Sequence, residues 1–286
     1  MQLYTVIRLL FFNFLAQHAV AAGIRSIFLF KDVMVSNTTA IETSGFNTLI
    51  IFGVGILDNG DIMYYSNTAG SSDVLIASNG TYVGGSALSD KVRSFKTASG
   101  TGINRVEICM NSIHVADLMA SPGPGSDTRL YKNFAALKTA WTLDAVNNDD
   151  ESIYDISSTV KFAQMLGQIG YKYTIAPYTA SSFWASLKSQ LGALLDRAYL
   201  QCYDGGAGNN PASWQTTLGM KVVPILWVIN DSKPSYGKTP AQAKTQFASW
   251  NSASALDGGG YWNDYDIERM GSSYVEYGSA LTSVFP

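Results

Sequence analysis

The stretch WTLDAVNNDDESIYDISSTVKFAQMLGQIGYKYTIAP, residues 141–177, decides the fold. It predicts a strand over 141–146, a helix over 156–169 and a second strand over 172–177. Both strand segments are rich in apolar and β-branched residues. The helical segment repeats apolar residues every three or four positions, and Gly170 stops it. A strand, a helix and another strand in this order form a βαβ unit, whose strands pair in parallel.

The same alternation continues outward from this unit in both directions. Helical spacing returns at 182–195 and at 239–250, where a Thr-Pro pair marks the helix start. Apolar strand-like runs lie at 24–30, 48–57, 105–110, 141–146, 172–177, 198–203, 221–229 and 259–262. Eight strands in about 265 residues are typical of a (β/α)8 TIM barrel, an α/β fold. Pro224 lacks an amide donor, so we expect the seventh strand to be bulged or irregular there.

One segment does not fit the alternation. Residues 57–102 are rich in Gly, Ser, Asn and Thr, and Asp58-Asn59-Gly60 is a strong hairpin turn. We therefore expect a β-rich insertion after the second strand. No linker or repeat interrupts the chain, so residues 22–286 are expected to form a single barrel domain.

Residues 1–21 have the pattern of a signal peptide. Arg8 precedes an apolar run at 9–15, and Ala19-Val20-Ala21 offers the small residues that a signal peptidase reads. The run is too short to span a bilayer. We expect a secreted, extracellular protein without a membrane partner. Asn-x-Ser/Thr triplets that fit a glycoprotein begin at Asn37, Asn79 and Asn230.

The composition favours a carbohydrate partner. Charged residues make up only 14% of the chain, the net charge is −3, and no cluster of Lys or Arg occurs, which argues against nucleic acid. Sixteen Tyr and six Trp suit an oligo- or polysaccharide, and we expect a monomer.

Secretion would permit a disulfide between Cys109 and Cys202, but a bridge needs closely placed Cβ atoms, and we expect two buried thiols.

Among the side chains that could carry out catalysis, the sequence favours carboxylates. Only His114 remains after the signal peptide, so no multi-His zinc site can form, and no Cys-x-x-Cys spacing occurs. No Gly-x-Gly-x-x-Gly follows a strand. We expect neither metal nor cofactor.

The end of the fourth strand carries the candidate catalytic residues. Barrel enzymes place their active sites where the strands end, and this strand continues as Asn147-Asn148-Asp149-Asp150-Glu151. If the chain stays extended, Asn147, Asp149 and Glu151 share one face. Two neighbouring carboxylates raise one pKa, which keeps a carboxyl group protonated as a general acid.

With Asp144, these residues resemble the D-x-x-D-x-D-x-E signature of glycoside hydrolase family 18, the chitinase-like barrel enzymes. The resemblance implies that Glu151 is the acid/base that protonates the leaving oxygen. It implies that Asp149 orients the substrate's 2-acetamido group, whose carbonyl oxygen attacks the anomeric carbon. Asp144 and Asn147 would support this pair, with Asn147 also bordering the substrate.

Two further strand ends resemble the same family. Gln201-Cys202-Tyr203-Asp204 resembles the Gln/Met-x-Tyr-Asn/Asp end of the sixth strand, where Tyr203 would hydrogen-bond the acetamido carbonyl. The eighth strand ends at Trp262, which would stack under the pyranose. Gln201, Asp204 and Trp227 are expected to bind substrate beside them.

The chain also departs from the family pattern. Asn147 replaces an Asp, Ala145 replaces a Gly, and the third strand lacks a Ser-x-Gly-Gly ending. The resemblance therefore indicates a divergent member that hydrolyses β-linked N-acetylglucosamine glycans, either chitin oligomers or the N-glycan core, by substrate-assisted retaining catalysis. The alternative is a catalytically inactive, chitinase-like carbohydrate-binding protein. A third hypothesis is a different barrel glycosidase with Asp149 as nucleophile.

Overall fold

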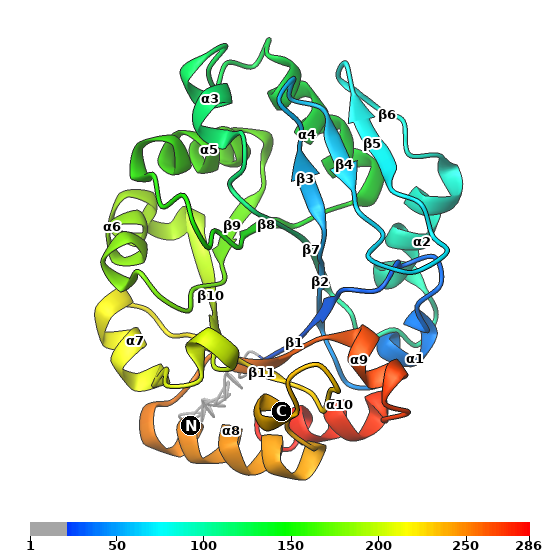
Figure 1. Ribbon diagram of the computed structural model, residues 1–286, viewed down its shortest axis with the longest axis vertical. Helices are drawn as coiled ribbons and strands as arrows, with labels where there is room; N and C mark the ends of the chain where they lie inside the picture. Colours follow the sequence, from blue (N-terminus) through cyan, green and yellow to red (C-terminus); the bar gives the residue numbers. More distant parts are fainter. Residues whose placement is uncertain (1–21) are drawn as a thin grey trace, which may run out of the picture.

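A closed barrel of eight parallel strands forms the centre of the molecule. The computed structural model describes residues 22–286, so the expected signal peptide lies outside the described part. Figure 1 looks down the ring of strands, with the helices around its outside. The predicted (β/α)8 barrel is confirmed. In spatial order its strands are β1 (Ile24–Leu29), β12 (Gly258–Trp262), β11 (Val223–Trp227), β10 (Leu195–Gln201), β9 (Lys172–Ile175), β8 (Ala145–Asn148), β7 (Arg105–Met110) and β2 (Thr48–Ile51).

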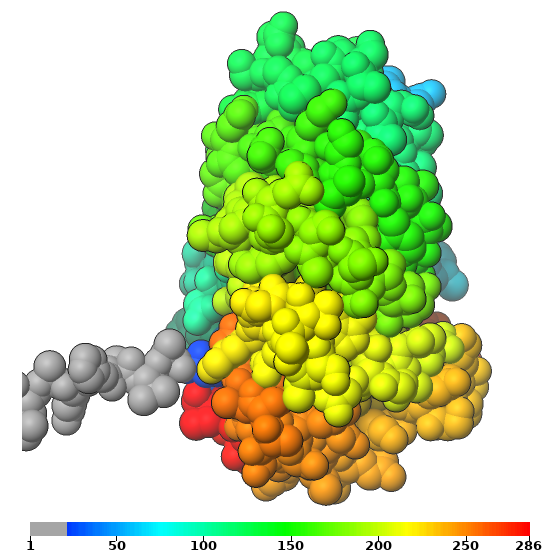
Figure 2. All heavy atoms as spheres, turned by 90° about the vertical axis from the view of Figure 1, so that its left-hand side faces the viewer, coloured from blue at the N-terminus to red at the C-terminus, as the bar shows by residue number. Residues whose placement is uncertain are grey.

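The helices follow the strands in chain order. Figure 2 shows the segments from green through yellow to orange lying one after another along one side of the molecule. Helix α5 begins after Asp155, whose side chain accepts from Ser158 N, and ends at Gly170 with φ of 98°. The α-helices are α1 (Thr38–Glu42), α2 (Ser86–Thr97), α3 (Val115–Ala120), α4 (Arg129–Trp141), α5 (Ile156–Ile169), α6 (Ser181–Leu191), α7 (Pro211–Leu218), α8 (Pro240–Ser254), α9 (Asp264–Arg269) and α10 (Tyr274–Thr282).

The insertion after the second barrel strand is a separate antiparallel sheet. Its strands are β3 (Val54–Ile56), β4 (Ile62–Tyr64), β5 (Val74–Ser78) and β6 (Thr81–Tyr82), which pair in chain order. The expected strand over 48–57 is thus two strands, interrupted at Gly53, where φ is 82°. In Figure 1 this sheet lies beside the barrel mouth, next to β2 and β7.

Two details of the fourth and seventh strands differ from expectation. The bounds of the predicted strand over 141–146 were wrong. Helix α4 extends through Trp141, and strand β8 spans Ala145–Asn148. The expected bulge at Pro224 was also wrong. Pro224 pairs with Leu200 in an unbroken register, and Cys202 N donates to Ile225 O on the same edge.

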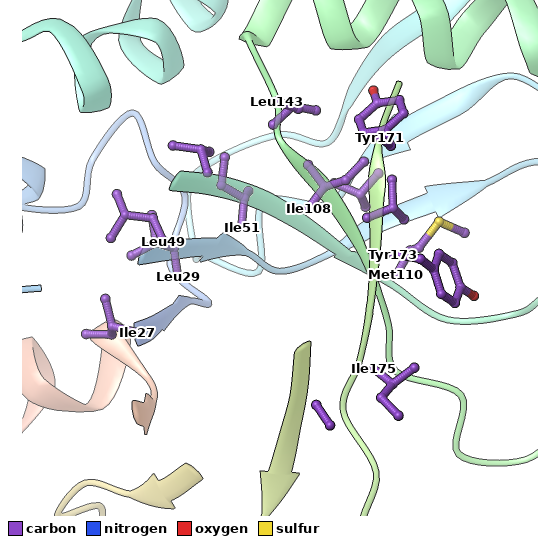
Figure 3. Close-up of a cluster of buried hydrophobic side chains, with 14 of the residues drawn as sticks. Ile27, Leu29, Leu49, Ile51, Ile108, Met110, Leu143, Tyr171, Tyr173 and Ile175 are labelled. Carbon is purple, nitrogen blue, oxygen red and sulfur yellow. The ribbon is translucent and has the colours of Figure 1, made fainter. Parts of the chain in front are cut away.

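Strand residues alternate between two apolar layers. The outer layer packs against the helices and includes Ile27, Leu49 and Ile108, shown in Figure 3. The inner layer fills the barrel with Phe28, Ile50, Cys109, Tyr199, Val223 and Ile225. Cys109 and Cys202 are buried free thiols, which confirms that prediction.

Glycines in β12 allow the barrel to close. A Cβ on Gly258 would collide with the backbone of Ile24, and one on Gly260 would collide with the side chain of Ser26. Both collisions are with β1, the strand that pairs with β12. The glycines therefore bring β1 close enough to complete the ring and carry the chain on to Trp262.

Polar side chains share the barrel interior with the inner apolar layer. Glu107 is fully buried and accepts hydrogen bonds from Arg105 Nε (2.6 Å), Tyr199 Oη (2.7 Å) and Thr174 Oγ1 (2.6 Å). Arg105 also binds both carboxylate oxygens of Asp196, at 2.8 and 2.9 Å. Each charge therefore has a partner, which buried charges require.

Candidate active site

The chain leaves β8 in an extended path and then turns sharply. Asp149 N donates to Met110 O at 2.9 Å, which prolongs the ladder between β8 and β7 by one residue. The turn follows at Asp150, whose carboxylate accepts from the backbone N–H groups of Ser152 (3.1 Å), Ile153 (2.8 Å) and Tyr154 (2.8 Å). Asp150 thus holds the loop, and Asp149 and Glu151 remain free to line the cavity at the barrel mouth.

This central cavity has a volume of about 400 Å³, within the range of small-molecule sites. Glu151 is exposed at its edge, whereas Asp149 is half-buried in it. Residues from six strand ends meet here, those of β2, β8, β9, β10, β11 and β12. The cavity is lined by Phe52, Asp149, Glu151, Tyr178, Gln201, Tyr203, Asp204, Gly205, Trp227 and Trp262.

Asp149 is held in place and made unusually basic. Gln201 Nε2 donates to Asp149 Oδ1 at 3.1 Å and to Ala176 O at 2.9 Å. Burial, followed by the negative charges of Glu151 and Asp150, raises the pKa of Asp149 from 3.8 to about 7, against the Gln201 hydrogen bond. Asp149 can therefore carry or release a proton near neutral pH, which suits acid–base chemistry.

Tyr203 faces the two carboxylates from the end of β10. Its ring meets Trp227 edge-on, with centroids 5.5 Å apart. Burial, and then the charges of Asp149 and Glu151, raise the pKa of Tyr203 well above its ordinary value. The hydroxyl therefore stays protonated and can donate a hydrogen bond to a substrate oxygen.

Trp262 forms an aromatic wall of the central cavity. Its ring packs edge-on against Phe28, Phe30 and Phe52, with centroid distances of 5.6, 5.5 and 4.8 Å. Three phenylalanines from β1 and the end of β2 thus fix one side of the indole. The ring also lines the cavity, where it offers an apolar face to a ligand.

Three other predicted residues lie in the cavity with tasks of their own. Gln201, expected to bind substrate, lines the cavity and also positions Asp149 through its Nε2. Asp204 lines the rim and forms an ion pair with Lys233. Trp227 lines the cavity while its indole N–H donates to Asp266 Oδ2 at 2.7 Å, which fixes the ring.

Two predicted residues lie away from the cavity. Asp144 precedes β8 at the opposite end of the barrel, where its carboxylate accepts from Lys96 Nζ (2.8 Å) and Val106 N (2.8 Å). The support role assigned to it was wrong for this reason. Asn147 is fully buried, and its Nδ2 donates to Thr174 Oγ1 at 2.9 Å. Within 22–286 its Oδ1 has no hydrogen-bond partner, and Asn147 does not line the central cavity, so the substrate contact expected of it was wrong.

Sequence reasoning missed Phe52, Tyr178 and Gly205 in the cavity and Asp150 in the loop. Phe52 directly follows β2 and Tyr178 follows β9 by three residues, so the strand-end rule could have found both. A Cβ on Gly205 would lie 3.0 Å from the Tyr178 ring, so this glycine permits their close approach. Asp150 showed no signal beyond its place in an acidic run.

In the described part of the chain, no three His, Cys, Asp or Glu side chains gather in a way that could hold a metal ion. Of the helices between residues 22 and 286, none has the length and apolar character needed to cross a bilayer.

Comparison with known proteins gives structural relatives only. No family model matches the sequence, and no curated protein matches it. The spore cortex-lytic enzyme SleL of Bacillus cereus superposes with a TM-score of 0.62 at 10% identity, covering 92% of this chain and 74% of SleL. A chitinase of Chromobacterium violaceum has a TM-score of 0.58 at 13% identity, covering 91% of this chain and 98% of that one.

A third relative is active domain 2 of a thermostable chitinase from Pyrococcus furiosus, studied with chito-oligosaccharides. It has a TM-score of 0.55 at 12% identity, covering 93% of this chain and 94% of that domain. These likenesses extend over nearly the whole described chain. They show that this protein has the barrel fold of the chitinases.

Proposed function

We propose that this protein is a glycoside hydrolase that cleaves β-linked N-acetylglucosamine glycans at the central cavity. The observation that carries the proposal is the meeting of Asp149, Glu151, Tyr203 and Trp262 in one cavity at the barrel mouth. These four residues come from three strand ends that resemble family 18. The chitinase-like fold supports the same substrate class.

Each residue has a role that its surroundings support. Glu151 is exposed at the cavity edge, where it protonates the glycosidic oxygen as the bond breaks. Asp149 receives a hydrogen bond from the 2-acetamido N–H, which aims the acetamido oxygen at the anomeric carbon. The Tyr203 hydroxyl donates to that oxygen, and Trp262 stacks against the apolar face of the ring. The acetamido oxygen takes the place of an enzymic nucleophile and displaces the protonated leaving group. Water then attacks the anomeric carbon, gives its proton to Glu151 and releases the acetamido oxygen, so the product retains its β configuration.

Substrate-assisted cleavage requires the acetyl group, and this requirement provides the test. The protein is incubated with N-acetylglucosamine oligomers and with their deacetylated counterparts, and new reducing ends are counted. We expect turnover of the acetylated oligomers alone. Equal cleavage of both would point to an enzymic nucleophile such as Asp149 and would overturn the mechanism.

A carbohydrate-binding protein without hydrolysis is the second candidate, because Asn147 and Ala145 depart from the family signature. It would bind the acetylated oligomers saturably, which quenching of tryptophan fluorescence would detect. Binding without new reducing ends over long incubation would favour this candidate over the enzyme.

We also propose that the protein is secreted and monomeric. The signal-peptide pattern of residues 1–21 supports secretion. N-terminal sequencing of the secreted protein would detect cleavage after Ala21. Of the three expected glycosylation triplets, Asn79 is exposed in a turn. Asn230 is buried with its Nδ2 donating to Val228 O at 3.1 Å, so it is a poor acceptor.

A further inference from the structure

The first turn of α9 begins two residues after Trp262 and carries two buried carboxylates. Asp264 is fully buried, and Asp266 is 6% exposed. Asn263 starts the helix, because its side-chain oxygen accepts from Asp266 N at 3.0 Å. Neither carboxylate lines the central cavity. Burying a carboxylate is costly unless it is hydrogen-bonded, so the partners of these two groups indicate what each of them holds.

Asp264 binds the chain that leaves β1. Its Oδ1 accepts from Phe30 N at 2.7 Å and from Lys31 N at 3.0 Å. Its Oδ2 accepts from Ser36 Oγ at 2.7 Å. In Figure 1, α9 lies beside β1. The three hydrogen bonds therefore fix the backbone at Phe30, one residue beyond the end of this strand.

Two further side chains of α9 hold the same segment. Glu268 accepts from Asn37 N at 2.7 Å and forms an ion pair with Lys31. The ring of Tyr265 meets the ring of Phe30 edge-on, with centroids 5.9 Å apart. The helix therefore holds this segment near both of its ends.

Phe30 connects Asp264 to the wall of the central cavity. A phenylalanine ring makes no hydrogen bond through a polar group of its own, so its place follows from its backbone and from its packing. The Phe30 ring packs edge-on against Trp262 and stacks against Phe52, with both centroid distances 5.5 Å. Trp262 and Phe52 both line the cavity. Asp264 thus acts on the cavity wall through one aromatic ring.

Trp227 is held by the same helical turn in a more direct way. Asp266 Oδ2 accepts from Trp227 Nε1 at 2.7 Å and from Asn263 Nδ2 at 3.2 Å. Trp227 ends β11 and Trp262 ends β12, so the two indoles come from different strands. One turn of α9 therefore holds both indoles of the central cavity.

We propose that Asp264 is a positioning residue for glycan binding, which holds the Trp262 ring through Phe30 in the orientation on which the reacting sugar stacks. This inference rests on the proposed function of the central cavity. A ring that is free to tilt presents its face to the sugar for only part of the time. The measured affinity then falls in proportion to the fraction of molecules whose ring is correctly placed.

The test measures the Kd of the N-acetylglucosamine hexamer by calorimetry, in the Glu151→Gln protein, where hydrolysis is slowed. We expect Asp264→Ala to raise this Kd about 3- to 10-fold, the contribution of one aromatic contact. Asp264→Asn keeps an oxygen that can accept from Phe30 N, and should hold the Kd within about twofold of the parent protein.

Phe30→Leu removes the ring but leaves Asp264 and its hydrogen bonds in place. It therefore tests the contact with Trp262 even if Asp264→Ala fails to fold, and we expect a similar rise in Kd. Adding Asp264→Ala to Phe30→Leu should change the Kd by less than about twofold, because the two residues act in series. A carboxylate that only stabilised the fold would give additive effects.

Asp61→Ala is the matched control. Asp61 is also buried, and its carboxylate accepts from the side chains of Asn59, Ser78 and Asn133. It lies between β3 and β4, outside the central cavity, so its loss should leave the Kd unchanged.

Three results would overturn the inference: an equal rise in Kd in Asp61→Ala, an unchanged Kd in Asp264→Ala or Phe30→Leu, or additive effects in the double variant. A hexamer that is neither bound by Glu151→Gln nor cleaved by the wild type would overturn the proposed function, and the inference with it.

Discussion

Replacing Asp149 by Asn should stabilise the protein, and more so as the pH rises. Burial raises the pKa of Asp149 from 3.8 to about 7, so the folded state holds the proton more tightly than the unfolded chain does. Below about pH 4 Asp149 is protonated in both the folded and the unfolded state, so its carboxyl group does not lower the free energy of unfolding. Between about pH 4 and pH 7 the unfolded chain ionises first, and stability is lost until both states are ionised.

The size of this effect follows from the same rise in pKa. Each pH unit corresponds to about 1.4 kcal/mol, so the full cost above pH 7 is about 4 kcal/mol. Asp149 is only half-buried, and cavity water will reduce the cost to about 2–4 kcal/mol. Asn has the same shape and can keep the hydrogen bond from Gln201, so Asp149→Asn removes the charge without removing the contact.

The measurement is urea unfolding of wild type and Asp149→Asn at pH 4 and pH 8, followed by tryptophan fluorescence. We expect the variant to gain about 2–4 kcal/mol at pH 8 relative to its difference at pH 4. Asp127→Asn is the control, because it removes a carboxylate from the exposed surface, where no burial penalty is released. A gain of the same size at both pH values would refute the argument that burial of this carboxylate sets its pKa.

Three further substitutions test other parts of the site. Tyr203→Phe keeps the ring against Trp227 but removes the hydroxyl, and should lower kcat/KM roughly 10²-fold; unchanged kinetics would rule out a donor role. Asp150→Ala removes the acceptor of three N–H groups and should lower the free energy of unfolding by about 1–3 kcal/mol, with faster hydrogen exchange in its loop; unchanged exchange would contradict the role given to this side chain. Asn147→Asp puts a carboxylate near Glu107 in the barrel interior and should cost roughly 3 kcal/mol at neutral pH; an unchanged Tm would count against a closed interior.

The barrel and the site around β8 could be predicted because the sequence shows two hydrophobic periodicities, one typical of helices and one typical of strands. Alternating strand and helix segments indicate a barrel, and a barrel brings the carboxyl ends of all its strands to one mouth. The period of two then decides which residues face the cavity. Asp149 follows from these rules, as do Tyr203 and Trp262 at β10 and β12. Glu151 does not, because the extended path expected through 147–151 ends in the turn at Asp150, which brings Glu151 to the cavity edge.

The wrong or missing predictions concern residues whose position depends on the path of the chain in three dimensions rather than on the hydrophobic periodicity of the sequence. Asp144 was expected near the site because it is the first residue of the D-x-x-D-x-D-x-E signature that the chain resembles. Five residues of extended chain span roughly 16 Å, which places Asp144 at the far end of the barrel from Asp149. The place of Tyr65 beside the loops that follow β7 and β8 could not be predicted at all, because Tyr65 reaches it only through the pairing of β3 with β4.

Glu151→Gln tests the central claim most directly. The amide keeps the size of the carboxyl group but has no proton to give to the glycosidic oxygen. With N-acetylglucosamine hexamer as substrate, we predict that kcat falls roughly 10²–10⁴-fold, while the hexamer still binds with a Kd close to that of the wild type. Equal rates of hydrolysis by the two proteins would contradict the assignment of Glu151 as the acid.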